Sequence, residues 1–259
     1  MSKETIKIYV ASHKKANFPN NKIYVPIRVG AALNDNDFGY VRDDTGDNIS
    51  NKNKNFCELT ATYWIWKNDK SDIVGLTHYR RYFFKRKKNN KLENVLDKND
   101  IKNILKDYDI IVPNRTFIIK HNVGKSWEKT HIKKDYDKCR KIIEEMYPDY
   151  LSAFDEFSKS RTLYLCNMFI SRKNIFDEYY KWLFDILFEV EKRTDITGYT
   201  EYQKRLYGFL SERLLNVWLE KHKEYKIKYL TVFKTDDLSR RAVIRRITNR
   251  LGITKGINH

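Results

Sequence analysis

Between residues 72 and 83 the chain reads Asp72-Ile73-Val74-Gly75-Leu76-Thr77-His78-Tyr79-Arg80-Arg81-Tyr82-Phe83. Its apolar part, residues 73–76, predicts a buried strand that passes directly into a histidine, a tyrosine and two adjacent arginines. In open α/β sheets, ligands bind at the edge where such strands end. The planar guanidinium group can bond two oxygens at once, so these arginines suit a phosphate-bearing ligand. The alternative is a strand followed by a solvated basic turn.

Length and composition limit the class of protein. The 259 residues allow one large domain, or one domain with a small appendage. Because 41% of the residues are hydrophobic and 14% are aromatic, the chain can fill a core and is not intrinsically disordered. Three cysteines, Cys57, Cys139 and Cys166, stand far apart without metal-ligand spacing and predict reduced thiols. Since no secretory signal or membrane span is visible, we expect a cytoplasmic protein.

The net charge is +17, from 51 Lys and Arg residues against 34 Asp and Glu residues. This excess points to nucleic acid, an anionic membrane surface or a phosphate-bearing small molecule as a partner. The abundant lysine and asparagine also fit an AT-rich genome, so the position of the charge matters more than its total. A non-catalytic nucleic-acid-binding protein that uses the basic aromatic patch is the alternative to an enzyme.

The hydrophobic pattern predicts strands that alternate with helices, which is typical of an α/β domain. The expected strands are residues 6–11, 73–76, 108–112 and 163–170. The expected helices are residues 57–67, 176–192 and 203–218. Asn55 is the expected N-cap of the first helix, with Glu58 completing a capping box.

The end of the chain has a different pattern. Five arginines alternate with four apolar residues: Arg240, Arg241, Arg245, Arg246 and Arg250 with Val243, Ile244, Ile247 and Leu251. Such a basic amphipathic helix can lie on an anionic bilayer. The alternative is a helix that packs on the domain with its arginines in water. We therefore divide the chain into a domain at residues 1–235 and a tail at residues 236–259.

Several well-known catalytic motifs are absent from the sequence. The chain has no P-loop, no GxGxxG fingerprint, no GxSxG motif and no HExxH motif. Three short acidic pairs have the DxD form that nucleotide-sugar transferases use for a divalent cation: Asp35-Asn36-Asp37, Asp107-Tyr108-Asp109 and Asp135-Tyr136-Asp137. None of them follows an apolar strand, so none predicts a metal site.

Seven blocks of sequence occur in a recognisable order: residues 8–14, 29–33, 40–50, 55–60, 74–83, 166–169 and 207–214. Together they closely resemble a bacterial family, catalogued as a domain of unknown function, of capsular-polysaccharide and O-antigen glycosyltransferases. The resemblance spans about residues 6–220. It implies a GT-A-like nucleotide-sugar-binding domain with a mixed central sheet flanked by helices. Some members are associated with galactofuranose transfer, which implies UDP-galactofuranose as one possible donor.

The resemblance implies two groups of donor-binding residues: Ala11, Ser12 and His13 at the end of the first strand, and the cluster His78, Tyr79, Arg80 and Arg81. The first group is expected under the nucleotide base. The second stands where such folds usually carry DxD. A preorganised cationic site can neutralise a leaving diphosphate without a metal. We therefore expect no cofactor, although the sequence leaves Mn²⁺ or Mg²⁺ open.

The remaining expected contacts are Asp43 and Asp47 for the donor, and Asn167 and Arg213 for the acceptor. The alternatives are a solvated turn for the acidic loop and a buried amide for Asn167. If the reaction inverts the anomeric centre, a carboxylate must take the proton of the acceptor hydroxyl. Glu212 is the first candidate for this base and Asp44 the second. The alternative for Glu212 is an ion pair with Arg213.

With this resemblance, we expect an inverting hexosyltransferase with a UDP-hexose donor and a lipid-linked surface-polysaccharide acceptor. We also expect a peripheral position at the inner face of the cell membrane and no nucleic-acid partner. A transferase also predicts one pocket in which residues 78–81 face residues 43–47.

Overall fold

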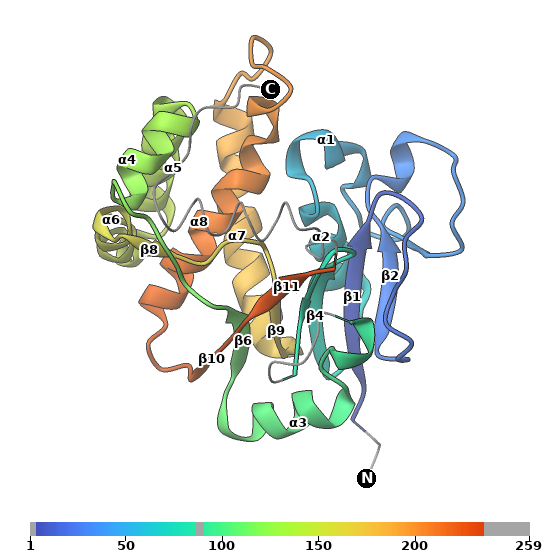
Figure 1. The fold of residues 1–259 in the computed structure, drawn as a ribbon. Helices are drawn as coiled ribbons and strands as arrows, with labels where there is room; N and C mark the ends of the chain where they lie inside the picture. Colours follow the sequence, from blue (N-terminus) through green and yellow to red (C-terminus); the bar gives the residue numbers. More distant parts are fainter. Residues whose placement is uncertain (1–3, 86–90, 236–259) are drawn as a thin grey trace.

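A computed structural model describes residues 4–85 and 91–235 (Figure 1). The predicted basic tail at residues 236–259 lies outside the described residues, so its helix and the boundary after residue 235 stay predictions. Within the two described ranges, no helix has the length and apolar character needed to cross a bilayer.

Nine strands of the described chain form one mixed sheet. They are β1 (Ile6–Ser12), β2 (Tyr24–Arg28), β3 (Val41–Arg42), β4 (Ile73–His78), β5 (Arg81–Phe83), β6 (Ile110–Pro113), β9 (Phe169–Arg172), β10 (Ile227–Leu230) and β11 (Val232–Lys234). The main order is β10-β6-β9-β4-β1-β2-β3, while β5 joins β4 to β11. Strand β1 is parallel to β2 and β4, and β9 is antiparallel to β4 and β6. Strands β7 (Thr116–Phe117) and β8 (Thr162–Leu163) form a separate pair.

Both faces of the sheet are buried. In β1, Ile8 and Val10 belong to one apolar cluster, whereas Tyr9 and Ala11 belong to the other. This alternation follows the two-residue period of a strand. A sheet with two covered faces needs helices on both sides, as in α/β proteins.

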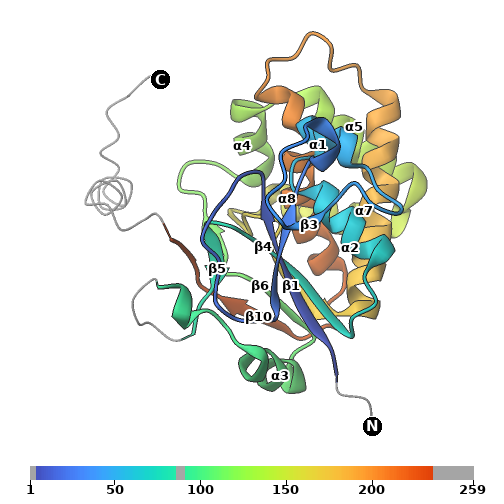
Figure 2. The same cartoon turned by 90° about the vertical axis from the view of Figure 1, so that its right-hand side faces the viewer.

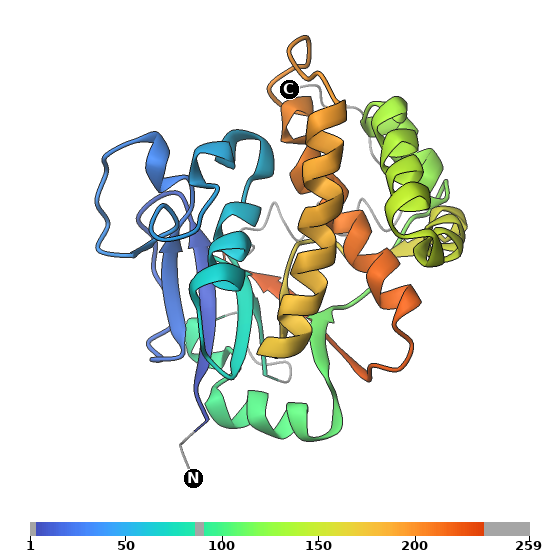
Figure 3. The same cartoon turned by 180° about the vertical axis from the view of Figure 1, so that it is seen from behind.

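Helices cover the two faces unequally. They are α1 (Asn53–Phe56), α2 (Leu59–Asn68), α3 (Lys98–Asp107), α4 (Val123–Thr130), α5 (Lys133–Met146), α6 (Leu151–Lys159), α7 (Lys173–Arg193) and α8 (Leu206–Lys221). Helices α2, α7 and α8 supply the cluster that contains Tyr9, and α3 packs on the opposite face (Figure 2). The long α7 runs along the back of the molecule, and α4, α5 and α6 lie to one side of it (Figure 3).

The predicted strands at residues 6–11, 73–76 and 108–112 and the helices at residues 176–192 and 203–218 are confirmed, with ends shifted by a few residues. The helix expected at residues 57–67 is also observed, as α2 with its start shifted to Leu59. Cys57, whose φ is 54°, lies between α1 and α2. Two other expectations are wrong. Asn55 lies inside α1 and caps nothing; its amide donates to the Lys204 carbonyl. The strand expected at residues 163–170 is split into β8 and β9, and Cys166 between them has a φ of 78°.

Gly75 lies in the middle of β4, where this strand packs closely against β9. A Cβ there would lie 2.5 Å from Cγ1 of Ile170 and 2.8 Å from the carbonyl oxygen of Phe169. Because the second atom is backbone, it cannot move away cheaply. We expect Gly75→Ala to lower the free energy of unfolding by about 1–3 kcal/mol, as overpacking of cores does.

Urea unfolding checks this prediction. Gly198→Ala is the matched control, because a Cβ at Gly198 would meet no atom within 4 Å. It should stay within about 0.5 kcal/mol of the parent protein. Equal unfolding midpoints for the two variants would contradict the close packing of β4 against β9.

Candidate active site

The carboxyl ends of β1 and β4 lie side by side. The two strands are parallel with Ala11 opposite His78, and the Tyr79 amide donates to the Ala11 carbonyl at 3.1 Å. From β1 the chain proceeds to β2 and β3 on one side, and it returns to β4 on the other side. Such a reversal of strand order is a topological switch point, where open α/β sheets bind ligands.

A cavity of about 650 Å³ opens at this edge. It is bounded by the ends of β1 and β4, the region from α1 to the start of α2, and the first turns of α8. Eight predicted site residues line it: Ala11, Ser12, His13, His78, Tyr79, Arg80, Arg81 and Glu212. The structure therefore brings together the predicted strand ends, the arginine cluster and the candidate base.

The charges in this cavity favour an anionic ligand. Four cationic side chains line it, those of Lys54, Arg80, Arg81 and Arg205, against the carboxylates of Glu58 and Glu212. The Arg80 guanidinium lies 5.0 Å from the centre of the Tyr79 ring. The centres of the His13 and Tyr79 rings are 5.5 Å apart, and the two ring planes are perpendicular. A cleft with an excess of one charge sign attracts ligands of the opposite sign.

His78 is held in its neutral form. Burial lowers its pKa; Glu58 opposes this shift, and Arg81 and Arg80 add to it. Its Nε2 lies 3.9 Å from Oε1 of Glu58 and has no hydrogen-bond partner within the described part of the chain. Burial also lowers the pKa of His13, with Lys14 and Arg80 acting in the same direction. Both rings are therefore uncharged near pH 7.

Glu58 is a cavity residue that sequence reasoning missed, because it was interpreted as a capping residue. The Asn167 amide donates to Oε1 of Glu58 at 2.9 Å, and the Ser211 hydroxyl donates to Oδ1 of Asn167 at 2.9 Å. Asn167 is only 3% exposed and lies behind the cavity wall. It therefore orients Glu58 from behind that wall. Glu58 belongs to the block at residues 55–60, which is one of the seven blocks that carry the family resemblance, and this membership could have identified it as a site residue.

Glu212 both lines the cavity and pairs with Arg213. The Cys166 amide donates to its Oε1 at 3.2 Å, and Nη1 of Arg213 donates to its Oε2 at 3.0 Å. Burial raises the pKa of Glu212, Arg213 opposes this shift, and Glu58 reinforces it. Arg213 itself is 9% exposed and packs over the Trp127 ring at 5.3 Å, outside the lining of the cavity.

The acidic loop does not face the arginine cluster. Asp43 is fully buried and accepts hydrogen bonds from the amides of Gly30 and Ala31 at 2.8 and 2.9 Å. The expected pocket between residues 78–81 and 43–47 is therefore not observed, and Asp43 instead orders the loop after β2.

The two other carboxylates of this loop also have protein partners. Asp44 forms a two-point ion pair with Arg42, at 3.0 and 2.6 Å, and Asp47 accepts from the Tyr63 hydroxyl at 3.0 Å. Neither lines the cavity. Asp44 is thus not placed to act as a base there, and Glu58 is the second carboxylate of the site.

Both non-glycine residues with positive φ in the described ranges adjoin the cavity. Cys57 lines it and accepts from Nε of Arg205 at 3.2 Å, while the backbone of Cys166 binds Glu212. Such conformations cost about 1–3 kcal/mol each and gather at functional sites. Burial raises the pKa of both thiols to about 11, so neither is an activated nucleophile.

Among the residues that the structure describes, no group of three or more His, Cys, Asp or Glu side chains could hold a metal ion. The three DxD-like pairs of the sequence therefore form no such group.

Comparison with known proteins gives a family and a fold. No curated protein matches the chain. A solved structure described as the apo form of WbbM, a bifunctional glycosyltransferase, is similar to it with a TM-score of 0.82 and 34% sequence identity. The similarity covers 88% of this chain and 45% of that one, so this chain spans less than half of WbbM. This similarity confirms the predicted mixed sheet flanked by helices.

A family model described as "Domain of unknown function (DUF4422)" matches residues 7–223. The chain belongs to this family.

Proposed function

We propose that this chain is a glycosyltransferase that moves a hexose from a UDP-linked donor to a glycan acceptor. One observation carries the proposal: a cavity at the switch point of the sheet combines Arg80 and Arg81 with the buried carboxylate of Glu212. The similarity to part of a bifunctional glycosyltransferase supports sugar transfer. UDP-galactofuranose is one donor that fits the family resemblance.

In this proposal, Arg80 and Arg81 bind the donor diphosphate. Guanidinium groups match the geometry of phosphate oxygens and stay charged at any physiological pH. The rings of His13 and Tyr79 stand perpendicular to each other beside Ala11, so the nucleobase can stack on the face of one ring and meet the edge of the other. The Ser12 hydroxyl donates to the Lys14 carbonyl at 2.6 Å, so Ser12 shapes the turn after β1 that presents His13.

The proposed chemistry is a direct displacement. The acceptor hydroxyl oxygen bonds to the anomeric carbon while the bond from that carbon to the phosphate oxygen breaks. UDP leaves with its charge balanced by the arginines, and the hydroxyl proton passes to the Glu212 carboxylate. This sequence of bond changes inverts the anomeric centre. The raised pKa of Glu212 makes it a better base than an exposed glutamate, because general bases work best when their pKa lies near the working pH.

We expect transfer to proceed without a divalent metal, because fixed positive charge can stabilise the leaving diphosphate. Activity should stay within twofold of its starting value when excess chelator is added. The measurement is product formation with chelator alone, and then with Mn²⁺ or Mg²⁺ restored. Complete loss with chelator and rescue by Mn²⁺ would contradict the prediction, and Glu58 and Glu212 would then be tested as carboxylate ligands.

A lipid-linked acceptor at an anionic membrane surface remains part of the proposal. The arginine-rich pattern of residues 240–250 supports it, because each basic residue near an anionic surface contributes about 1 kcal/mol. Two exposed apolar side chains add support: Phe117 and Ile119 are 58% and 61% exposed, with Lys120 beside them.

Co-sedimentation with vesicles tests the membrane prediction. Replacing the five arginines of the tail by glutamine should abolish binding to anionic vesicles and leave UDP affinity unchanged. The parent protein on zwitterionic vesicles is the control for charge. A substituted protein that still sediments with anionic vesicles would refute the role of the tail, and a Phe117→Ser, Ile119→Ser variant would then locate the contact.

Calorimetry with UDP and a panel of UDP-hexoses tests the proposed function. We expect saturable one-to-one binding. The nucleic-acid alternative predicts a different result: binding to a single-stranded oligonucleotide that weakens steeply with salt, and no nucleotide affinity. That result would overturn the transferase assignment.

A further inference from the structure

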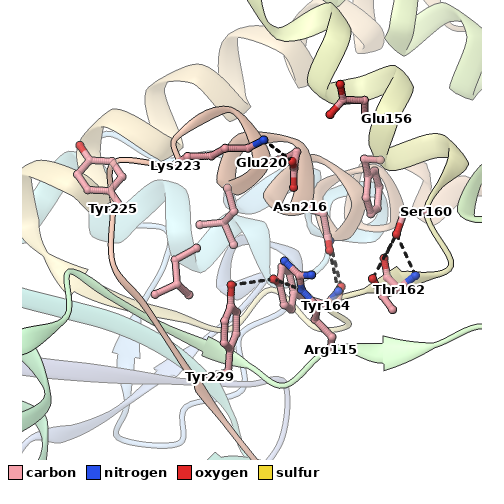
Figure 4. A pocket seen from close by; sticks show the side chains of 13 residues that line it. Arg115, Glu156, Ser160, Thr162, Tyr164, Asn216, Glu220, Lys223, Tyr225 and Tyr229 are labelled. Carbon is pink, nitrogen blue, oxygen red and sulfur yellow. Dashed lines mark hydrogen bonds and ion pairs between the residues drawn. The ribbon is translucent and has the colours of Figure 1, made fainter.

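A second cavity of about 480 Å³ lies between α6, α8 and β10, away from the arginine cluster (Figure 4). Its volume is within the range of roughly 300–1,000 Å³ that is usual for small-ligand sites. None of the predicted site residues lines it. Its walls combine the rings of Tyr164, Tyr225 and Tyr229 with a set of polar and charged side chains.

The aromatic wall is rigid and presents one open ring. Tyr164 and Tyr229 stack with ring centres 5.5 Å apart and planes 13° apart. The Tyr164 hydroxyl donates to that of Tyr229 at 3.1 Å, and Nε of Arg115 donates to the Tyr164 hydroxyl at 2.5 Å. Tyr164 is 3% exposed, whereas Tyr229 is 38% exposed. The inner ring and Arg115, whose guanidinium carbon lies 5.7 Å from the centre of the Tyr229 ring, therefore fix the outer ring. The exposed part of that ring is available to a ligand with an apolar face.

The polar wall favours a neutral ligand rich in hydroxyl groups. Arg115 and Lys223 balance Glu156 and Glu220, so the cavity has no excess of either charge. Lys223 pairs with Glu220 at 3.0 Å. This balance disfavours a polyphosphate or a nucleic acid, which need a net positive surface. Donors and acceptors beside an open aromatic ring are the groups that a carbohydrate needs, since a sugar has apolar ring faces and many hydroxyls.

One face of α8 contributes to both cavities. Phe209 and Glu212 of α8 line the first cavity, and Asn216 and Glu220 of the same helix line the second. These positions are three or four residues apart, which places them on a single face of the helix. The eight residues from Glu212 to Glu220 correspond to about 12 Å along the helix axis.

The segment between β8 and β9 also touches both cavities. The Tyr164 amide donates to Oδ1 of Asn216 at 2.7 Å, and two residues later the Cys166 amide donates to Glu212 at 3.2 Å. Because residues 164–166 cover α8 between these two side chains, a chain of sugars whose terminal hydroxyl reaches Glu212 would pass over the outer side of this segment to reach Tyr229.

We propose that the second cavity is a glycan subsite, which binds sugars of the acceptor that lie behind the residue being extended. This proposal rests on the proposed function of the first cavity. It assigns Tyr229 as the stacking platform, and Glu220 and Arg115 as partners for the sugar hydroxyls. It also explains why a site for neutral sugars is separate from the cationic donor site.

Saturation-transfer NMR with a panel of trisaccharides tests the proposal. The probes are α- and β-linked trisaccharides of galactose, glucose, rhamnose and N-acetylglucosamine, and UDP affinity is measured on the same samples. We expect at least one probe to bind, and Tyr229→Ala to weaken it at least fivefold with UDP affinity unchanged. Tyr229→Phe keeps the ring and should stay within twofold. Tyr108→Ala is the matched control, because Tyr108 lines neither cavity and has Lys228 over its ring as Tyr229 has Arg115.

Glu220→Ala provides a second variant that does not alter the aromatic stack, and it should weaken the same probe at least threefold. Equal binding by the parent protein, Tyr229→Ala and Glu220→Ala would overturn the subsite, as would UDP binding without any trisaccharide binding at millimolar concentration. In both cases the donor site would stand. Trisaccharide binding through Tyr229 in a protein that binds no UDP would overturn the acceptor role and would count against the proposed function instead.

Discussion

Arg81→Ala is expected to weaken UDP binding about 10- to 150-fold. Loss of a hydrogen bond to a charged group costs about 1.5–3 kcal/mol, and each 1.4 kcal/mol corresponds to a factor of ten in the dissociation constant. Arg81 is the first residue of β5, pairs with His78 of β4 and lines the cavity at the carboxyl ends of β1 and β4. Arg80→Ala should act in the same direction, because its side chain lines the same wall.

Isothermal titration calorimetry measures this effect, with Arg140→Ala as the control. Arg140 lies on α5, pairs with Asp155 at 2.7 Å and does not line the cavity. Its variant should bind UDP within twofold of the parent protein. Unchanged UDP affinity in both Arg80→Ala and Arg81→Ala would show that the diphosphate does not bind at this cluster.

Glu212→Gln is expected to reduce the rate of sugar transfer about 100- to 10,000-fold, the usual contribution of a general base. The affinity for UDP should stay within threefold, because the proposal gives Glu212 no contact with the diphosphate. Asp44→Asn is the control, since Asp44 is paired with Arg42 outside the cavity, and this variant should transfer sugar normally. Steady-state kinetics on the three proteins gives the comparison.

The pH profile supplies an independent test of the same residue. A base must be deprotonated, so the rate falls as the pH drops through the pKa of Glu212. Because burial raises this pKa, the loss should begin above the ordinary glutamate value of 4.5. Full activity in Glu212→Gln, together with a large loss in Glu58→Gln, would transfer the role of base to Glu58.

The sequence was sufficient for those parts of the fold where local pattern and tertiary structure agree. The apolar run of β4 and the amphipathic α7 satisfy strand and helix periods, and both are observed. The pattern did not predict the breaks at Cys57 and Cys166, where positive φ separates α1 from α2 and interrupts the strand expected at residues 163–170. Nothing in a cysteine signals that conformation, because glycine is the residue that normally adopts it. Both breaks adjoin the cavity, so the local rule fails where the site is built.

The acidic loop shows a second limit of sequence reasoning. A carboxylate that binds a sugar and one that accepts backbone amides look the same in one dimension. The Asp43 carboxylate accepts hydrogen bonds from the backbone amides of Gly30 and Ala31, which are 13 and 12 residues away in sequence. Gly30 has a φ of 66°. Conversely, Glu58 was predicted only as a cap, because its contact with Asn167 spans 109 residues.

A crystal structure of the protein with UDP tests the central claim most directly. The account predicts a diphosphate within hydrogen-bond distance of the Arg80 and Arg81 guanidinium groups, with the uracil against the rings of His13 and Tyr79. A diphosphate bound elsewhere on the protein, with the cavity at the ends of β1 and β4 empty, would contradict it.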